Sequence, residues 1–375
     1  MDKGMITLKT VIDKAVKRAR AEQAKAKKTP KDEDLEAFLK EALPVIRVVG
    51  TGGAGNNTIT RLHEMGVKGA ELIAVNTDAQ QLIYTPADRK IIIGRRLLGG
   101  KGAGSDPRLG EQAAQEDIDE IKEALKGSDL VFITAGLGGG TGSGSAPVIA
   151  EAARELGALT VAVVTLPFSS EGRVRLENAI MSLSKLLKAA DTIIIIPNDK
   201  LLEIAPDLPI NAAFKVSDEI LANAIKGITE MITKPGLINL DFNDLKTVLS
   251  KGGPAVIGLG ESQSDGTPED RALEAVEDAL ASPLLDVDIS DADRALINVV
   301  GGTEMTLKEA EMIAEAVASK IHPRAHIIWG AMIDPELPKN LIQTMVVISG
   351  GRIPYLQELQ DIAEKRLNLD IDFVE

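Results

Sequence analysis

Glycines cluster at three points of the chain, two of them where a predicted strand is followed by a predicted helix. The first cluster, Gly50-Thr-Gly-Gly-Ala-Gly55, fits the spacing G-x-G-x-x-G. Glycine lets the backbone approach a phosphate closely, and the N-terminus of the following helix favours the negative charge. The second cluster runs from Gly136 to Gly144, and the third is Gly102-Ala-Gly-Ser105. Three loops at one edge of a sheet could together bind a single polyphosphate.

The number of loops favours a nucleoside triphosphate, since a dehydrogenase needs only one loop for its pyrophosphate. The usual triphosphate motif G-x-x-x-x-G-K-[ST] is absent, because Lys101 is followed by Gly102. Backbone N–H groups are therefore expected to hold the phosphates. A NAD-dependent Rossmann oxidoreductase stays open as an alternative, because Asn76-Thr-Asp78 ends the second strand, where such folds place a ribose-binding acid.

Two pairs of charged residues stand at predicted helix starts. Asp241 and Asp244 stand three residues apart at the predicted start of a helix, on one face. On the residues alone they suit N-capping. Glu171 and Arg175 have the spacing of an ordinary surface ion pair at a helix start, and that interpretation is preferred on the residues alone.

Strands and helices alternate regularly through the first half of the chain. Such alternation, with strands that are apolar throughout, predicts a parallel sheet covered on both faces. The expected strands are 45–49, 71–75, 90–93, 129–134, 160–166 and 192–197, with a glycine-rich loop at 94–104 and a helix at 109–126. A long helix at 212–232 ends at Pro235-Gly236, and strands and helices after it follow a mixed α+β pattern.

A length of 375 residues predicts more than one domain. We expect an α/β, Rossmann-like domain with a parallel sheet at 44–210 and a long central helix at 211–235, joined to a smaller α+β domain at 236–350. An N-terminal helical extension at 1–43 has a basic amphipathic pattern. It is interpreted as a docked helix or solvated arm, with binding to a membrane surface or partner as the alternative. The residues at 351–375 are expected to form a charged, helical C-terminal tail.

Composition excludes several classes of function. The net charge of −14 argues against a broad nucleic-acid face, which needs clustered Lys and Arg. The absence of cysteine excludes disulfides, thiolate zinc sites and a cysteine nucleophile. No stretch approaches the roughly 18 apolar residues of a membrane span, and the first residues do not form a secretion signal. A cytoplasmic protein is expected.

The segment Gly138–Gly144 resembles the tubulin signature loop, and residues 45–348 resemble the FtsZ family of prokaryotic cell-division GTPases, the archaeal members most of all. This resemblance implies a tubulin/FtsZ-type GTP-binding domain followed by a GTPase-activating C-terminal domain. It implies head-to-tail filaments of the division ring at mid-cell, which hydrolyse GTP to GDP and phosphate between adjacent subunits. A tubulin-like filament protein for cell shape is the alternative.

The resemblance also assigns roles to residues. In the family, Asp241 and Asp244 polarise the attacking water, Asn239 helps to position it, and all three reach the nucleotide of the next subunit. Phe214 stacks on the guanine, and the third loop senses the γ-phosphate. The implied nucleotide-binding residues are Gly52, Gly53, Ala54, Gly55, Asn56, Asn57, Asn76, Asp78, Gly102, Ala103, Gly104, Gly139, Gly140, Thr141, Gly142, Glu171, Arg175, Asn198, Phe214 and Asp218.

Other expectations concern the metal and the partners. Mg²⁺ is expected to be held mainly by the phosphates and water, with no all-protein metal cage. The family more often has Asn where Asp106 stands, and this extra carboxylate could repel phosphate or help to order Mg²⁺. The main partner is the chain itself. Membrane-tethering and division proteins are expected at the basic N-terminal arm or at Leu367–Glu375.

Overall fold

The computed structural model describes residues 43–364, except residues 205, 208, 235, 239, 251, 265 and 286. The described residues from Pro44 onward belong to one compact unit. The expected N-terminal extension, Asn239 and the candidate contact at Leu367–Glu375 lie outside the described residues. Among the described residues, no helix is both long enough and apolar enough to cross a membrane.

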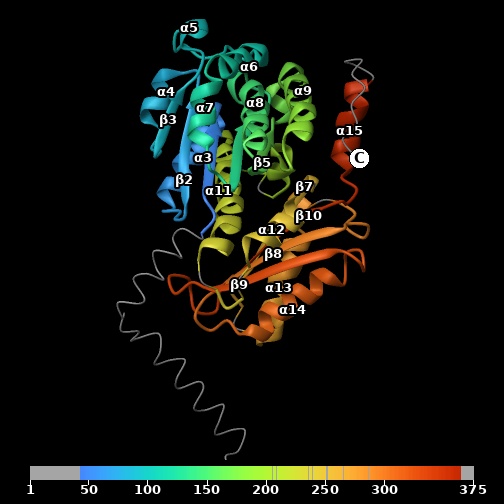
Figure 1. Ribbon diagram of the computed structural model, residues 1–375. Coiled ribbons are helices and arrows are strands. Elements are labelled where there is room, and N and C mark those ends of the chain that lie inside the picture. The colour runs from blue at the N-terminus through green and yellow to red at the C-terminus, as the bar shows by residue number, and fades with distance from the viewer. Residues whose placement is uncertain are drawn as a thin grey trace, which may run out of the picture. The chain divides into compact units, whose positions relative to one another are not determined.

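The first six strands form a parallel sheet, which confirms the predicted α/β class (Figure 1). The central strands at 130–136, 159–166 and 192–197 are almost wholly buried, as expected for strands covered on both faces. In spatial order the six strands are β3 (Arg89–Ile92), β2 (Ala70–Asn76), β1 (Ile46–Thr51), β4 (Leu130–Gly136), β5 (Leu159–Leu166) and β6 (Thr192–Pro197).

Helices cover both faces of this sheet, and neighbouring strand residues point to opposite faces. Val48 packs with α3 (Gly52–Glu64) and α11 (Ile210–Thr233), whereas Val49 belongs to the cluster that contains α6, α8 and α9. Figure 1 shows those three helices together on one side of the strands. The helices are α4 (Ala79–Tyr84), α5 (Arg95–Leu98), α6 (Pro107–Glu116), α7 (Ile118–Leu125), α8 (Thr141–Glu155), α9 (Arg173–Ala189) and α10 (Asn198–Ile204).

The sheet continues into the C-terminal part of the chain. Strand β7 (Gly253–Ser262) pairs with β6 in parallel, from Thr192 opposite Gly253 to Ile194 opposite Ala255. Beyond it comes β10 (Ile342–Ser349), which is antiparallel to β7. The next strand is β8 (Arg294–Gly301), antiparallel to β10, and the last is β9 (His326–Ile333), parallel to β8. The ten strands therefore form one continuous sheet, and the division into domains at residues 210 and 236 stays a prediction.

Four helices accompany the C-terminal strands. They are α12 (Phe242–Leu249), α13 (Pro268–Leu280), α14 (Leu307–Ala318) and α15 (Pro354–Ile362). A buried ion pair joins α13 to α14, in which the Nη2 of Arg271 donates to Oε1 of Glu309 over 2.7 Å. Tyr355 of α15 donates from its hydroxyl to the carbonyl of Ile195 in β6 over 3.4 Å, so the helix also contacts the first half of the sheet.

Local structure differs from the sequence prediction at three places. The expected helix at 109–126 is broken into α6 and α7, because Asp117 leaves the helical conformation and its carboxylate accepts a hydrogen bond from Gly94 N over 2.7 Å. The glycine-rich loop at 94–104 contains the short helix α5, and α10 was not predicted. The helices α5 and α10 are one or two turns long, and hydrophobic periodicity does not reveal helices of that length.

Candidate active site

A cavity of about 450 Å³ opens at the carboxyl ends of the parallel strands. Its volume lies within the range of small-molecule sites. The residues around it come from the three glycine loops, from the ends of β2, β4 and β5, and from α3, α4, α9, α10 and α11. The predicted residues that line it are Gly53, Ala54, Asn57, Asn76, Asp78, Gly102, Gly139, Gly140, Thr141, Gly142, Glu171, Arg175, Asn198, Phe214 and Asp218.

The three loops pack backbone against backbone. Gly52 has a φ of +70°, and a Cβ there would lie 2.7 Å from the N of Gly142, so the first and second loops touch. A Cβ on Gly140 would lie 2.9 Å from Asp106 N and 3.1 Å from Ala103 O, so the second loop also touches the third. Any side chain at these two positions would push the loops apart.

Two helices begin at the cavity with open N-termini. Neither α3 nor α8 has a side-chain cap, and neither has an acidic residue in its first turn. Their first N–H groups have no partner within the helix, and the helix dipole favours an anion at that point. Arg175 is the single Lys or Arg among the described lining residues. An anion in this cavity would therefore be bound mainly by backbone N–H groups.

Five predicted residues do not line the cavity: Gly52, Gly55, Asn56, Ala103 and Gly104. Gly55 is close behind the first loop, since a Cβ there would lie 2.4 Å from Thr134 O. Asn56 is 1% exposed, and its amide can donate to Gly50 O and Val75 O over 2.9 Å and 3.2 Å. Gly55 and Asn56 lie behind the surface and fix the shape of the first loop.

An aromatic ring and a carboxylate occupy one end of the cavity. Phe214 is 40% exposed and meets Phe168 edge to face, with ring centroids 5.2 Å apart. Asp218 lies one turn further along α11 and accepts a hydrogen bond from Asn57. Burial removes water from this carboxylate and raises its pKa to about 7, although the Asn57 bond acts in the opposite direction. The side chain can therefore titrate near neutral pH.

The ion-pair interpretation of Glu171 and Arg175 is confirmed, whereas their contact with a nucleotide stays a prediction. The two side chains form the expected ion pair, and both line the cavity. Glu171 also accepts a hydrogen bond from Phe168 N over 2.9 Å, which fixes its orientation.

Asp106 lies outside the lining and caps α6. It accepts hydrogen bonds from the backbone N of Arg108 over 2.9 Å and from the guanidinium of the same residue. These bonds lower the pKa of the Asp106 carboxyl. The structure thus gives this carboxylate a capping role, and neither of the roles suggested by the sequence is needed to explain it.

Several lining residues were not predicted, among them Gln81, Thr165 and Ser217. Gln81 accepts from Asn76 over 3.0 Å and donates to Gly53 O over 3.4 Å, so it links the first loop to the end of β2. No sequence pattern marks Gln81 as part of the site. Thr165 lies in the apolar strand β5, and Ser217 lies between Val216 and Asp218 in α11; no sequence pattern marks either residue as part of the site.

Asp241 and Asp244 lie outside the cavity. They form a reciprocal cap at the start of α12, where Asp244 N donates to Asp241 over 2.9 Å and Asp241 N donates to Asp244 over 3.4 Å. Both side chains are exposed, and α12 packs against β8 and β9. Within one chain, the pair faces solvent and does not reach the glycine loops.

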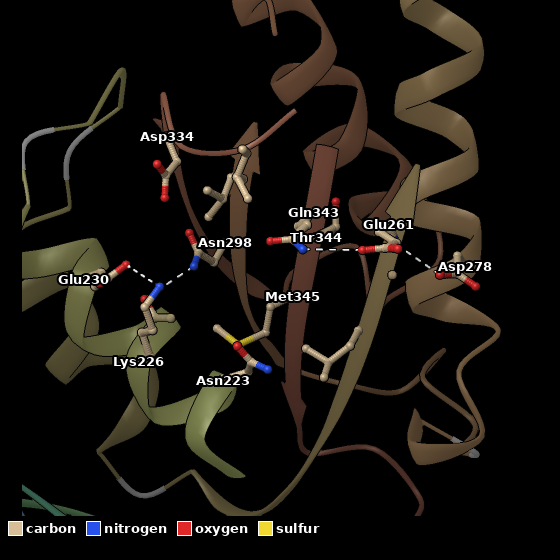
Figure 2. A pocket seen from close by; sticks show the side chains of 15 residues that line it. Asn223, Lys226, Glu230, Glu261, Asp278, Asn298, Asp334, Gln343, Thr344 and Met345 are labelled. Atoms are coloured by element: carbon tan, nitrogen blue, oxygen red, sulfur yellow. Dashed lines mark hydrogen bonds and ion pairs between the residues drawn. The ribbon is translucent and has the colours of Figure 1, made fainter. Parts of the chain in front are cut away.

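A second cavity, of about 360 Å³, lies between α11 and strands β7, β8 and β10. Figure 2 shows Lys226 and Glu230 of α11 on one side of it and Glu261 on the other, with Asn298 and Thr344 between them. None of the three glycine loops lines this cavity.

Comparisons with known families cover most of the chain. Residues 45–206 match the family model described as "Tubulin/FtsZ family, GTPase domain". Residues 253–352 match the model described as "FtsZ family, C-terminal domain". Together the two matches include the glycine loops and most of the C-terminal strands.

Similar proteins include cell division protein FtsZ 1 of Archaeoglobus fulgidus, 55% identical over 353 residues, which are 93% of this chain and 95% of that protein. Cell division protein FtsZ of Methanothermobacter thermautotrophicus is 57% identical over 334 residues, 89% of this chain and 86% of that protein. A solved structure titled as an empty FtsZ dimer from M. jannaschii has a TM-score of 0.81 and 55% identity, and covers 86% of this chain and 92% of that chain. CetZ2 from Haloferax volcanii, at 22% identity and a TM-score of 0.74 over 86% of this chain and 98% of that chain, shares the fold.

Proposed function

We propose, from the premise that the chain belongs to the Tubulin/FtsZ family, that it is a self-assembling cytoskeletal GTPase of the cell-division ring. The observation that carries the proposal is the cavity at the open N-termini of α3 and α8, where three glycine loops meet. Arg175 is the single Lys or Arg among the described residues that line it. Such a site suits a polyphosphate bound through backbone N–H groups.

The opposite end of the cavity suits guanine. An ionised carboxylate at Asp218 can accept from N1–H and from the exocyclic amine of guanine together, whereas adenine offers no such pair of donors. Phe214 provides an exposed ring on which the base can stack. The site is therefore proposed to bind GTP and GDP in preference to ATP.

Hydrolysis is proposed to take place between two subunits. Asp241 and Asp244 are exposed and lie outside their own chain's cavity, which suits residues that act on the nucleotide of a neighbour. The carboxylates would polarise the attacking water, with Asn239 helping to position it. Most of the rate would come from positioning and charge stabilisation, as in other phosphoryl transfers.

A contact between the front of one subunit and the back of the next is heterologous, so it produces an open filament when the rotation between subunits does not close a ring. The solved relatives support self-association, since one is titled as an FtsZ dimer and CetZ2 as a protofilament with bound GTPγS. GTP buried at the contact would make assembly depend on the nucleotide, and hydrolysis would weaken the contact.

Mg²⁺ is proposed to be held mainly by the phosphates and water. The described residues contain no group of three or more His, Asp or Glu side chains that could hold a metal ion. The Thr141 hydroxyl and the Asp78 carboxylate both line the cavity and are the oxygen groups suited to such an ion or its water. When bound, the ion would neutralise phosphate charge.

The alternatives have less support. The FtsZ names of the relatives at 55% and 57% identity favour division over a separate filament protein for cell shape. A NAD-dependent oxidoreductase is not favoured, since the family model that includes all three glycine loops is a GTPase domain. The proposed location is the cytoplasm at mid-cell, with tethering and division proteins bound through the N- or C-terminal extension.

The first experiment is sedimentation of the purified protein with Mg²⁺ and GTP, GDP, ATP or no nucleotide. We expect the protein to pellet with GTP and to stay in the supernatant with ATP or without nucleotide. No pelleting over a wide range of protein concentration and temperature would contradict self-assembly by this chain alone.

A mixing experiment tests the shared active site. One variant, Asp244→Asn, keeps its nucleotide cavity, and the other, Asp218→Ala, keeps its catalytic loop. Each is expected to hydrolyse GTP slowly alone, and their mixture to recover part of the activity, because the loop of one meets the nucleotide of the other. No recovery in the mixture, with both variants folded, would place the whole active site within one chain.

A further inference from the structure

The third glycine loop contains the single non-glycine residue with a positive φ in the described part of the chain. Ser105 has a φ of 64°, a conformation that side chains other than glycine rarely adopt. Its carbonyl accepts a hydrogen bond from Nδ2 of Asn178 over 3.2 Å. A strained loop residue of this kind persists only when its surroundings hold it in place.

The same amide also holds the second loop. Nδ2 of Asn178 donates to Gly138 O over 3.3 Å, so one side chain bridges the two loops. The side chain is 8% exposed, and the bridge is therefore largely shielded from water. Gly138 lies directly against α9, since a Cβ there would be 2.9 Å from Arg175 O.

Three residues of α9 face the site at helical spacing. Arg175 lines the cavity, Asn178 bridges the loops one turn later, and Ser182 donates to Ser143 O over 2.7 Å at the start of α8. Positions i, i+3 and i+7 fall on one face of a helix. This face of α9 therefore forms a common support for the nucleotide end of α8 and for the third loop.

The third loop has few other attachments near its tip. Gly102 N donates to Thr77 O over 3.1 Å, and Asp106 N donates to Ala103 O over 3.0 Å within the loop itself. Gly102 and Gly104 both have positive φ values, +82° and +58°, and glycine at these positions adds backbone freedom. The Asn178 bridge thus restricts a loop that its own backbone leaves adaptable.

We propose that Asn178 is a positioning residue that holds the third loop where it can contact the terminal phosphate, so that the site distinguishes GTP from GDP. This inference rests on the proposed GTP site and goes beyond it, because Asn178 itself does not line the cavity. The side chain acts through the loops it joins. Without the bridge, the second loop would keep the bonds from Gly138 N to Ser143 Oγ and from Ser182 to Ser143 O. The third loop would lose its hydrogen bond to α9, so its contact with the terminal phosphate would weaken.

The test compares nucleotide affinity in the full-length wild type, Asn178→Ala and Asn178→Asp. The aspartate is nearly isosteric but presents oxygen atoms to two carbonyl groups. Ser184→Ala is the matched control, since Ser184 lies in the same helix and its hydroxyl donates to Met181 O within that helix. Binding of GTP and GDP with Mg²⁺ is measured by calorimetry below the concentration for assembly, with GTPγS as the slowly hydrolysed probe, and folding is checked by thermal unfolding.

In both Asn178 variants we expect GTPγS affinity to fall about tenfold and GDP affinity to change less than threefold, with the control unchanged; lost hydrogen bonds of ordinary strength account for such a factor. An equal loss for both nucleotides, no loss, or failure of both variants to fold would each overturn the proposal. Failure of the wild type to bind GTP would instead refute the GTP site on which it rests.

Discussion

The titration of Asp218 makes a quantitative prediction about GTP binding. Burial raises the pKa of this carboxyl to about 7 in the empty protein, whereas recognition of guanine N1–H and the amine needs the ionised form. About one tenth of the protein is ionised at pH 6 and about nine tenths at pH 8. GTP affinity should therefore rise roughly tenfold over this range, which corresponds to about 1.4 kcal/mol, and binding should release protons near pH 7.

The variant Asp218→Asn isolates this effect. The terminal phosphate of GTP titrates in the same range, so the pH dependence of the wild type alone is not sufficient. The asparagine variant keeps the phosphate contribution and loses the carboxylate contribution. Calorimetry at pH 6, 7 and 8 in buffers of different ionisation enthalpy measures both the affinity and the protons released.

The pH dependence of GTP affinity should differ between the two proteins, because the wild type should gain about tenfold more affinity between pH 6 and pH 8 than the variant.

The thermal stability of the two proteins supplies a second readout. The folded pKa is raised above the unfolded value of 3.8, so this group stabilises the empty protein at low pH and the contribution is lost as the pH rises toward 7. Asp218→Asn should therefore unfold at a higher temperature than the wild type at pH 8. Parallel slopes in both proteins would refute the assignment of Asp218 to guanine recognition.

Three further variants test other parts of the structure. Asp241→Asn keeps a good helix N-cap but loses the charge, so thermal stability should stay within about 0.5 kcal/mol while GTP hydrolysis, measured as phosphate release, falls at least tenfold. Phe214→Ala should weaken GTP binding about tenfold by calorimetry, because it removes the ring proposed to stack on the base and its edge contact with Phe168; unchanged affinity would exclude stacking. Arg271→Ala leaves Glu309 buried without its partner, so urea unfolding should show a loss of about 3 kcal/mol with GTP affinity unchanged, and a loss below 1 kcal/mol would contradict the ion-pair argument.

Much of the fold was predictable from local sequence. Apolar strands at regular spacing predicted the parallel sheet, and β6 was predicted with the bounds that the structure has. The predicted cap at Asp241 is present, because capping depends on residues three positions apart. The glycine loops could be located for the same reason, since each is a short segment of neighbouring residues.

Long-range packing decided the remaining features. No local pattern states that Gly52 touches Gly142, that the β6–β7 pairing extends the sheet into the C-terminal part, or that Gln81 enters the cavity. The capping role of Asp106 depends on the course of α6.

The sequence by itself determined which segments could bind phosphate and which residue types could recognise a base, because these properties belong to neighbouring residues and their backbone. The tertiary structure alone decided how far each group is shielded from water and which loops share a support. The pKa of Asp218 and the bridge from Asn178 both arise in this way. Burial and hydrogen bonding between distant segments exist only after the chain has folded, so residue type and spacing do not specify them.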